Sequence, residues 1–137
     1  MPRLTVWMVR TALLELGIGF TFGMWMLFNK GVLIDPYAFG LLGAHVEMML
    51  LGWTIQLAFG VAFWILPRFP QAQRYGRERL GWLGYGLINA GLLLVVLNTW
   101  LQVAWLPFAG RALELVGVIS FAVLIWPRVK AYGFPAT

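Results

Sequence analysis

His45, the only histidine of the chain, is the residue best suited to hold a metal ion. It lies near the start of a long apolar segment, GAHVEMMLLGWTIQLAFGVAFWILPR (residues 43–68), and Glu47 follows two positions later. A neutral imidazole is a good ligand for haem iron. The chain has no cysteine and no second histidine, so we expect no copper or zinc centre within one subunit.

A helical wheel separates His45 from Glu47. At about 100° per residue the two side chains lie about 200° apart, so they cannot bind one ion from the same helix. The face of His45 instead carries Met49, Gly52 and Gln56. The missing side chain of Gly52 predicts room for the edge of a flat cofactor beside the imidazole.

Further residues are candidates for contact with such a cofactor. Aromatic side chains that could pack on a porphyrin are Trp53, Phe59 and Phe63. Groups that could reach its propionates are Lys30, Trp100, Trp105 and Arg111. A lone histidine in an apolar helix also occurs as a hydrogen-bonded packing residue, and the wheel alone leaves that interpretation open.

These residues lie in elements that must be membrane helices. Only 11% of the residues are charged, against about 25% in a typical soluble domain, and 61% are hydrophobic. A helix needs about 20 apolar residues to cross a bilayer. Four such segments predict a single all-α, four-transmembrane-helix domain over residues 1–137, with spans at about 7–28, 37–66, 80–101 and 110–126.

The charge distribution predicts the orientation. With four spans, both termini and the 68–79 loop share one side, which holds eight of the ten arginines and lysines; the other side has Lys30 and Arg111. The positive-inside rule places the termini in the cytoplasm, in the inner membrane of a prokaryote. The basic charge is therefore topological, and we expect a lipid bilayer and not a nucleic acid as the partner.

Glycines recur at helical spacing in several spans. Gly19 and Gly23 form a GxxxG pattern with Glu15 one turn earlier, and Gly84, Gly91 and Asn98 repeat every seven residues. Small residues let membrane helices approach closely. The pattern predicts close helix packing and favours a homo-oligomer.

The pattern His45-x-Glu47-x4-Gly52-Trp53, followed by Gly60 and Leu66-Pro67-Arg68, resembles the second transmembrane helix of haem-copper oxidase subunit I and nitric-oxide reductase large subunits. In that family a histidine near the outer end of this helix ligates a b-type haem. The resemblance implies haem b on His45. Many relatives carry a second histidine where this chain has Glu47, and the further metal-binding histidines are missing, which argues against oxygen or nitric-oxide reduction.

We therefore expect a small membrane haem b protein with His45 as axial ligand near the outer side. It would transfer electrons with a redox partner or bind a diatomic gas such as O2 or NO. The alternative is a non-catalytic oligomeric channel, carrier or assembly factor without haem. In that case Glu15, Glu47, Gln56 and Asn98 would line a polar path.

Overall fold

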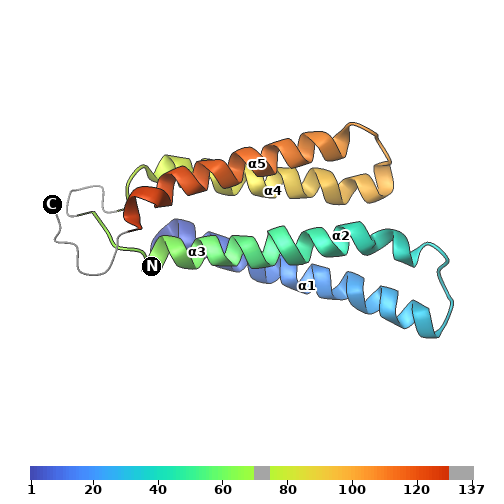
Figure 1. Ribbon diagram of the computed structural model, residues 1–137. Coiled ribbons are helices and arrows are strands. Elements are labelled where there is room, and N and C mark those ends of the chain that lie inside the picture. Colours follow the sequence, from blue (N-terminus) through green and yellow to red (C-terminus); the bar gives the residue numbers. More distant parts are fainter. Residues whose placement is uncertain (70–74, 130–137) are drawn as a thin grey trace.

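The computed structural model describes residues 1–69 and 75–129, and almost all of this part of the chain is helical (Figure 1). The first helix is α1 (Arg3–Gly31). The second span joins four pieces end to end: η1 (Ala38–Leu41), α2 (Leu42–Glu47), η2 (Met48–Ile55) and α3 (Gln56–Ile65). The third is α4 (Glu78–Leu101), and the fourth is α5 (Leu106–Ile125), extended by η3 (Trp126–Arg128).

Four helices are long and apolar enough to cross a membrane, namely Arg3–Gly31, Ala38–Ile65, Glu78–Leu101 and Leu106–Arg128. The predicted number of spans is confirmed, and the chain folds as a multi-pass membrane protein. The first helix begins four residues before the predicted residue 7, because the apolar residue Leu4 packs in the core.

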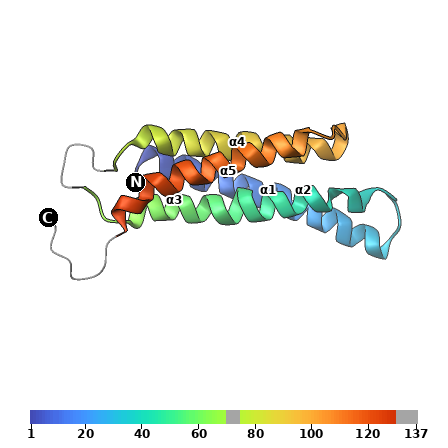
Figure 2. The ribbon, with the colours of Figure 1, turned by 45° about the horizontal axis from the view of Figure 1, so that its top comes forward.

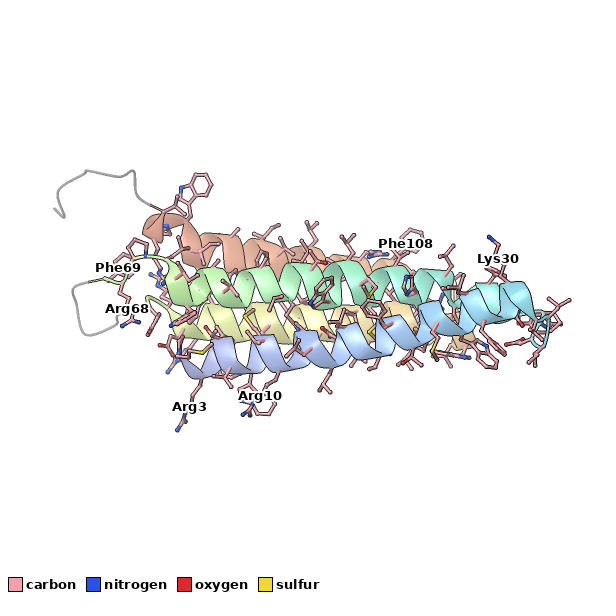
Figure 3. The ribbon with its side chains drawn as sticks, turned by 90° about the horizontal axis from the view of Figure 1, so that it is seen from below. Arg3, Arg10, Lys30, Arg68, Phe69 and Phe108 are labelled. Carbon is pink, nitrogen blue, oxygen red and sulfur yellow. The ribbon has the colours of Figure 1, made fainter. Side chains whose placement is uncertain are left out.

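The four spans run along one common axis (Figures 1 and 2). We call the end that carries the N-terminus and residues 66–69 and 75–77 the proximal end. The end that carries the loops at 32–37 and 102–105 is the distal end. Arg3, Arg10 and Arg68 lie towards the proximal end and Lys30 towards the distal end (Figure 3), whereas Arg74 and Lys130 lie outside the described residues.

Glycines close the hairpin of α4 and α5. A Cβ atom on Gly91 would lie 2.5 Å from the carbonyl oxygen of Gly110, and one on Gly84 would lie 2.9 Å from that of Gly117. No side chain fits at these distances. The glycine repeats therefore bring the two helix backbones into direct contact, as the sequence predicts.

Glycines also close the hairpin of α1 and the second span. Gly19 and Gly23 of α1 receive side chains from α2 and η2, while Gly52 and Gly60 of the second span receive side chains from α1. The glycine faces from which we expected a homo-oligomer thus pack within the chain. The homo-oligomer itself stays a prediction.

The two hairpins are joined by two apolar clusters. The proximal cluster contains Leu4, Met8, Phe63, Phe121 and Leu124, and the distal cluster contains Ala44, Met48, Leu92 and Val96. Each cluster draws side chains from both hairpins. Between the two clusters the interior carries the polar side chains of Glu15, Gln56 and Asn89, whereas His45 lies beside Ala44 of the distal cluster.

Candidate functional site

His45 is followed by a π-helical segment, η2 (Met48–Ile55), that separates it from Gln56. Within η2 the hydroxyl of Thr54 donates a hydrogen bond to the carbonyl of Met49, at 2.8 Å. Such wide turns are rare and are found frequently at functional sites. The residues that face α1 come from both sides of this segment and from the segment itself.

The ring of His45 lies on the GxxxG pattern of α1. Its Nδ1 atom is 2.7 Å from the carbonyl oxygen of Gly19, and a Cβ atom on Gly23 would lie 2.8 Å from its Cε1 atom. A carbonyl oxygen only accepts hydrogen bonds, so Nδ1 carries the proton and donates it. In the neutral form of the ring, the lone pair of Nε2 then stays available for another partner.

The other residues of the predicted cofactor face also point towards α1. Met49 packs on Gly19, whose Cβ atom would lie 2.8 Å from the methionine sulfur. The side chain of Glu15 lies against Gly52, with an Oε2 atom 2.9 Å from where a Cβ would be. The predicted space beside Gly52 is therefore filled by Glu15.

Gln56 is the centre of a buried hydrogen-bond chain that links three helices. Its amide nitrogen donates to Oε2 of Glu15 at 3.0 Å, and its amide oxygen accepts from Asn89 of α4 at 2.6 Å. Gln56 is completely buried and Glu15 is 6% exposed. One level towards the proximal end, the hydroxyl groups of Thr11 and Tyr85 are 2.8 Å apart.

Glu47 lies away from this chain, as the wheel predicts, and faces α5. Both of its carboxylate oxygens contact the guanidinium of Arg111, at 2.6 and 2.7 Å. Arg111 also bonds Glu114 at 3.1 Å. One half-exposed cation thus holds two buried carboxylates, and Arg111 lies on the Glu47 side of the second span and not beside His45.

The aromatic residues that we expected to pack on a porphyrin lie away from His45 or are partly exposed. Phe59 stacks on Phe121 of α5, with ring centroids 4.4 Å apart, and Phe63 is buried in the proximal cluster. Trp53 is partly exposed. The expectation that Phe59 and Phe63 pack on a porphyrin is wrong for this fold, because both rings belong to the core at the other end of the helix.

The buried polar side chains also differ from those that we expected to line a polar path under the alternative function. Asn98 does not line it, since its side-chain oxygen accepts a hydrogen bond from the backbone of Val103 beyond the end of α4. Asn89, Tyr85 and Thr11 take part instead. Asn89 could have been found in the sequence, because it is an amide in the middle of an otherwise apolar span.

The role of Arg128 cannot be read from the sequence. In the sequence it is one of the basic residues that set the orientation, yet in the structure its side chain is buried, with 1% exposed. It donates hydrogen bonds of 2.7 to 3.0 Å to the carbonyls of Phe63, Leu66 and Pro67. These carbonyls lie at the end of α3, where the helix itself supplies no donor.

No protein-family model, curated protein or solved structure matches the chain. Any conclusion about function therefore rests on the site itself.

Proposed function

We propose that the protein is a small membrane haem b protein in which Nε2 of His45 is the axial ligand of the iron. Bound haem would supply reversible electron transfer or an iron position for a diatomic gas. The chain itself positions the imidazole and provides an apolar surface around it.

The hydrogen bond from Nδ1 of His45 to the carbonyl of Gly19 is the observation that supports this proposal most directly. A ligating histidine almost always donates its second ring N–H to a carbonyl or carboxylate, which fixes the tautomer and the ring orientation. Gly23 supports the same orientation, because its lack of a side chain lets the ring approach the backbone of α1 closely.

The surroundings of His45 fit an iron ligand but do not enclose a porphyrin inside one chain. Met49 and Glu15 fill the gaps at Gly19 and Gly52, so the macrocycle would lie on the outer surface of the hairpin. His45 is partly exposed. The residues next to Gly19 and Gly23 and those near His45 in the sequence include exposed apolar side chains, namely Phe20, Met24, Leu42 and Val46. A second copy of the chain would cover the haem, in line with the expected homo-oligomer.

We also propose that the proximal end lies in the cytoplasm of a prokaryote and the distal end outside its inner membrane. The excess of arginine at the proximal end supports this orientation. His45 then lies nearer the outer side, where a redox partner or a diffusing gas could reach the haem.

Absorption spectroscopy of the purified protein tests the haem proposal. We expect a Soret band after expression with sufficient haem, and its loss in His45→Gly. Added imidazole should restore the band in His45→Gly, because it replaces the missing ligand without a change in the chain. Met49→Leu, a change on the same face, should keep the band.

A colourless wild-type protein that stays colourless after haem reconstitution would refute the proposal. A Soret band that persists in His45→Gly without imidazole would also contradict it, since the iron would then have another ligand.

A second candidate is a haem-free membrane carrier or assembly protein that works through its polar interior. The chain of Glu15, Gln56 and Asn89 favours it, because a buried carboxylate that accepts a side-chain hydrogen bond from one amide, Gln56, in the described part of the chain is costly in a membrane unless it serves a function. A haem-free protein whose activity in cells survives His45→Ala but not Glu15→Ala would support this candidate.

A further inference from the structure

A cavity of about 470 Å³ opens at the distal end, between the 32–37 loop and the last turn of α4. Its volume lies in the usual range for small-ligand sites, about 300–1,000 Å³. The lining includes three aromatic rings and three polar side chains: Phe22, Tyr37, Trp100, Asp35, Thr99 and Gln102. His45 is not part of this lining, so the cavity is separate from the proposed haem ligand.

The charge of the cavity is negative. Asp35 lines it and has no cation partner, since both ion pairs found in the described part of the chain belong to Arg111. The last turn of α4 adds the negative end of its helix dipole, which favours a bound cation. Anionic groups such as haem propionates would be repelled here.

The carboxylate of Asp35 is held in place by its own loop. Its Oδ1 atom accepts the backbone N–H of Tyr37 at 2.9 Å, and its Oδ2 atom lies 3.4 Å from the indole nitrogen of Trp25. The loop is tied to α1 by Asn29, which is 1% exposed. The Asn29 side chain bonds the backbone of Ile34 and Asp35 at 2.7 to 2.9 Å.

The opposite wall is fixed in a comparable way. Gln102 ends α4 in the left-handed conformation, with φ 52°, where glycine or asparagine is usual. Its backbone N–H donates to the carbonyl of Asn98, whose side chain accepts the N–H of Val103. An asparagine in the last turn before each loop therefore preorganises one wall of the cavity.

The aromatic rings add a second attraction for cations. Trp100 meets Phe22 edge to face, with ring centroids 6.3 Å apart, and it is 57% exposed. Tryptophan and tyrosine faces attract organic cations, and quaternary ammonium groups are commonly recognised in this way. Tryptophan is common at membrane interfaces in any case. What distinguishes this cavity is the unpaired, fixed carboxylate beside the rings.

We propose that this cavity binds an alkylammonium group, with Asp35 as the counter-ion and Trp100 and Tyr37 as the aromatic contacts. The group could belong to a lipid headgroup such as ethanolamine or to a free amine, and the two sources share the same chemistry.

Fluorine NMR of the full chain labelled with 5-fluorotryptophan tests the site. The resonance of Trp100, assigned with Trp100→Phe, should shift saturably in detergent with tetramethylammonium or ethanolamine. It should also differ between nanodiscs of phosphatidylethanolamine and of phosphatidylglycerol. Trp126, exposed near the proximal end, is an internal control that should not respond. A response to the free amines shows that a soluble amine can occupy the site. A response to phosphatidylethanolamine alone shows that the site takes the lipid headgroup.

Asp35→Asn is the matched variant, because an asparagine oxygen can still accept the N–H of Tyr37. We expect it to weaken the Trp100 response at least tenfold while the resonance of Trp126, far from Asp35, stays in place, which shows that the fold is kept; Trp25, whose indole contacts Asp35, is not used as a control. The proposal fails if neither the free amines nor phosphatidylethanolamine gives a Trp100 response that phosphatidylglycerol lacks, or if Asp35→Asn responds as wild type does.

Discussion

At the scale of single residues, the site depends on where side chains are absent. The ring of His45 can approach α1 because Gly23 has no Cβ atom, and its Nδ1 atom then lies 2.7 Å from the carbonyl oxygen of Gly19. The glycines of α1 thus decide which ring nitrogen of His45 stays free to bind a ligand.

Gly23→Ala should therefore displace the imidazole. The new Cβ atom would lie 2.8 Å from Cε1 of His45, and we expect a loss of about 1–3 kcal/mol in unfolding free energy from overpacking. If haem is bound, its Soret band should weaken or shift. Denaturation in mixed micelles measures the first effect and absorption the second.

Gly17→Ala is the control for this change, because Gly17 sits in the same helix and a Cβ atom there would meet no neighbouring atom within 4 Å. It should be neutral, or stabilising by up to about 1 kcal/mol through helix propensity. Equal losses in both variants would show that the contact with His45 does not matter.

At the scale of elements, the second span is where sequence and structure differ most. The sequence predicts one regular helix, whereas the structure places a π-helical segment at Met48–Ile55. The wheel puts His45, Gly52 and Gln56 on one face, and in the structure that face meets α1. It could not show that Gln56 also reaches Asn89, because that contact needs the position of α4.

The end of α3 depends on a residue that lies far away in the sequence. Arg128 satisfies three backbone carbonyls there, and hydrogen bonds from a charged donor contribute about 1.5–3 kcal/mol each. We expect Arg128→Leu to lower the unfolding free energy by at least about 2 kcal/mol in the same denaturation assay.

Arg3→Leu is a suitable comparison, because Arg3 is also an arginine of the proximal end but is exposed. Its unfolding free energy should change by less than about 0.5 kcal/mol. A stability of Arg128→Leu as high as that of Arg3→Leu would contradict the capping role.

At the scale of the whole molecule, one kind of contact holds each hairpin together and another kind joins the two hairpins. Glycines close each hairpin, whereas polar side chains join one hairpin to the other at several levels. The polar links are Glu47–Arg111, Gln56–Asn89, Thr11–Tyr85 and the contacts of Arg128 with the end of α3. The order of these links along the axis fixes the register of the two hairpins.

The pair of Glu47 and Arg111 should be a measurable part of this joint. We expect Arg111→Gln to cost about 1–3 kcal/mol, less than the 3–5 kcal/mol of a fully buried pair, because the guanidinium side chain is 55% exposed. A double-mutant cycle with Glu47→Gln should give a coupling energy above about 1 kcal/mol.

Lys30→Gln is the control for this cycle, since Lys30 is the other cation of the distal end and makes no ion pair in the described part of the chain. It should change stability by less than about 0.5 kcal/mol. Additive effects of Glu47→Gln and Arg111→Gln would show that the pair does not hold the hairpins together.

The sequence by itself determined the number of spans, their membrane character and the separation of Glu47 from His45. These features follow from apolar length and helical periodicity, which are local properties of the chain. Only the tertiary structure decided what fills the space beside each glycine, which cation meets Glu47 and why Arg128 is buried. Those outcomes depend on which helices are neighbours and on how far each is shifted along the bundle axis. The periodicity within one helix does not contain that information.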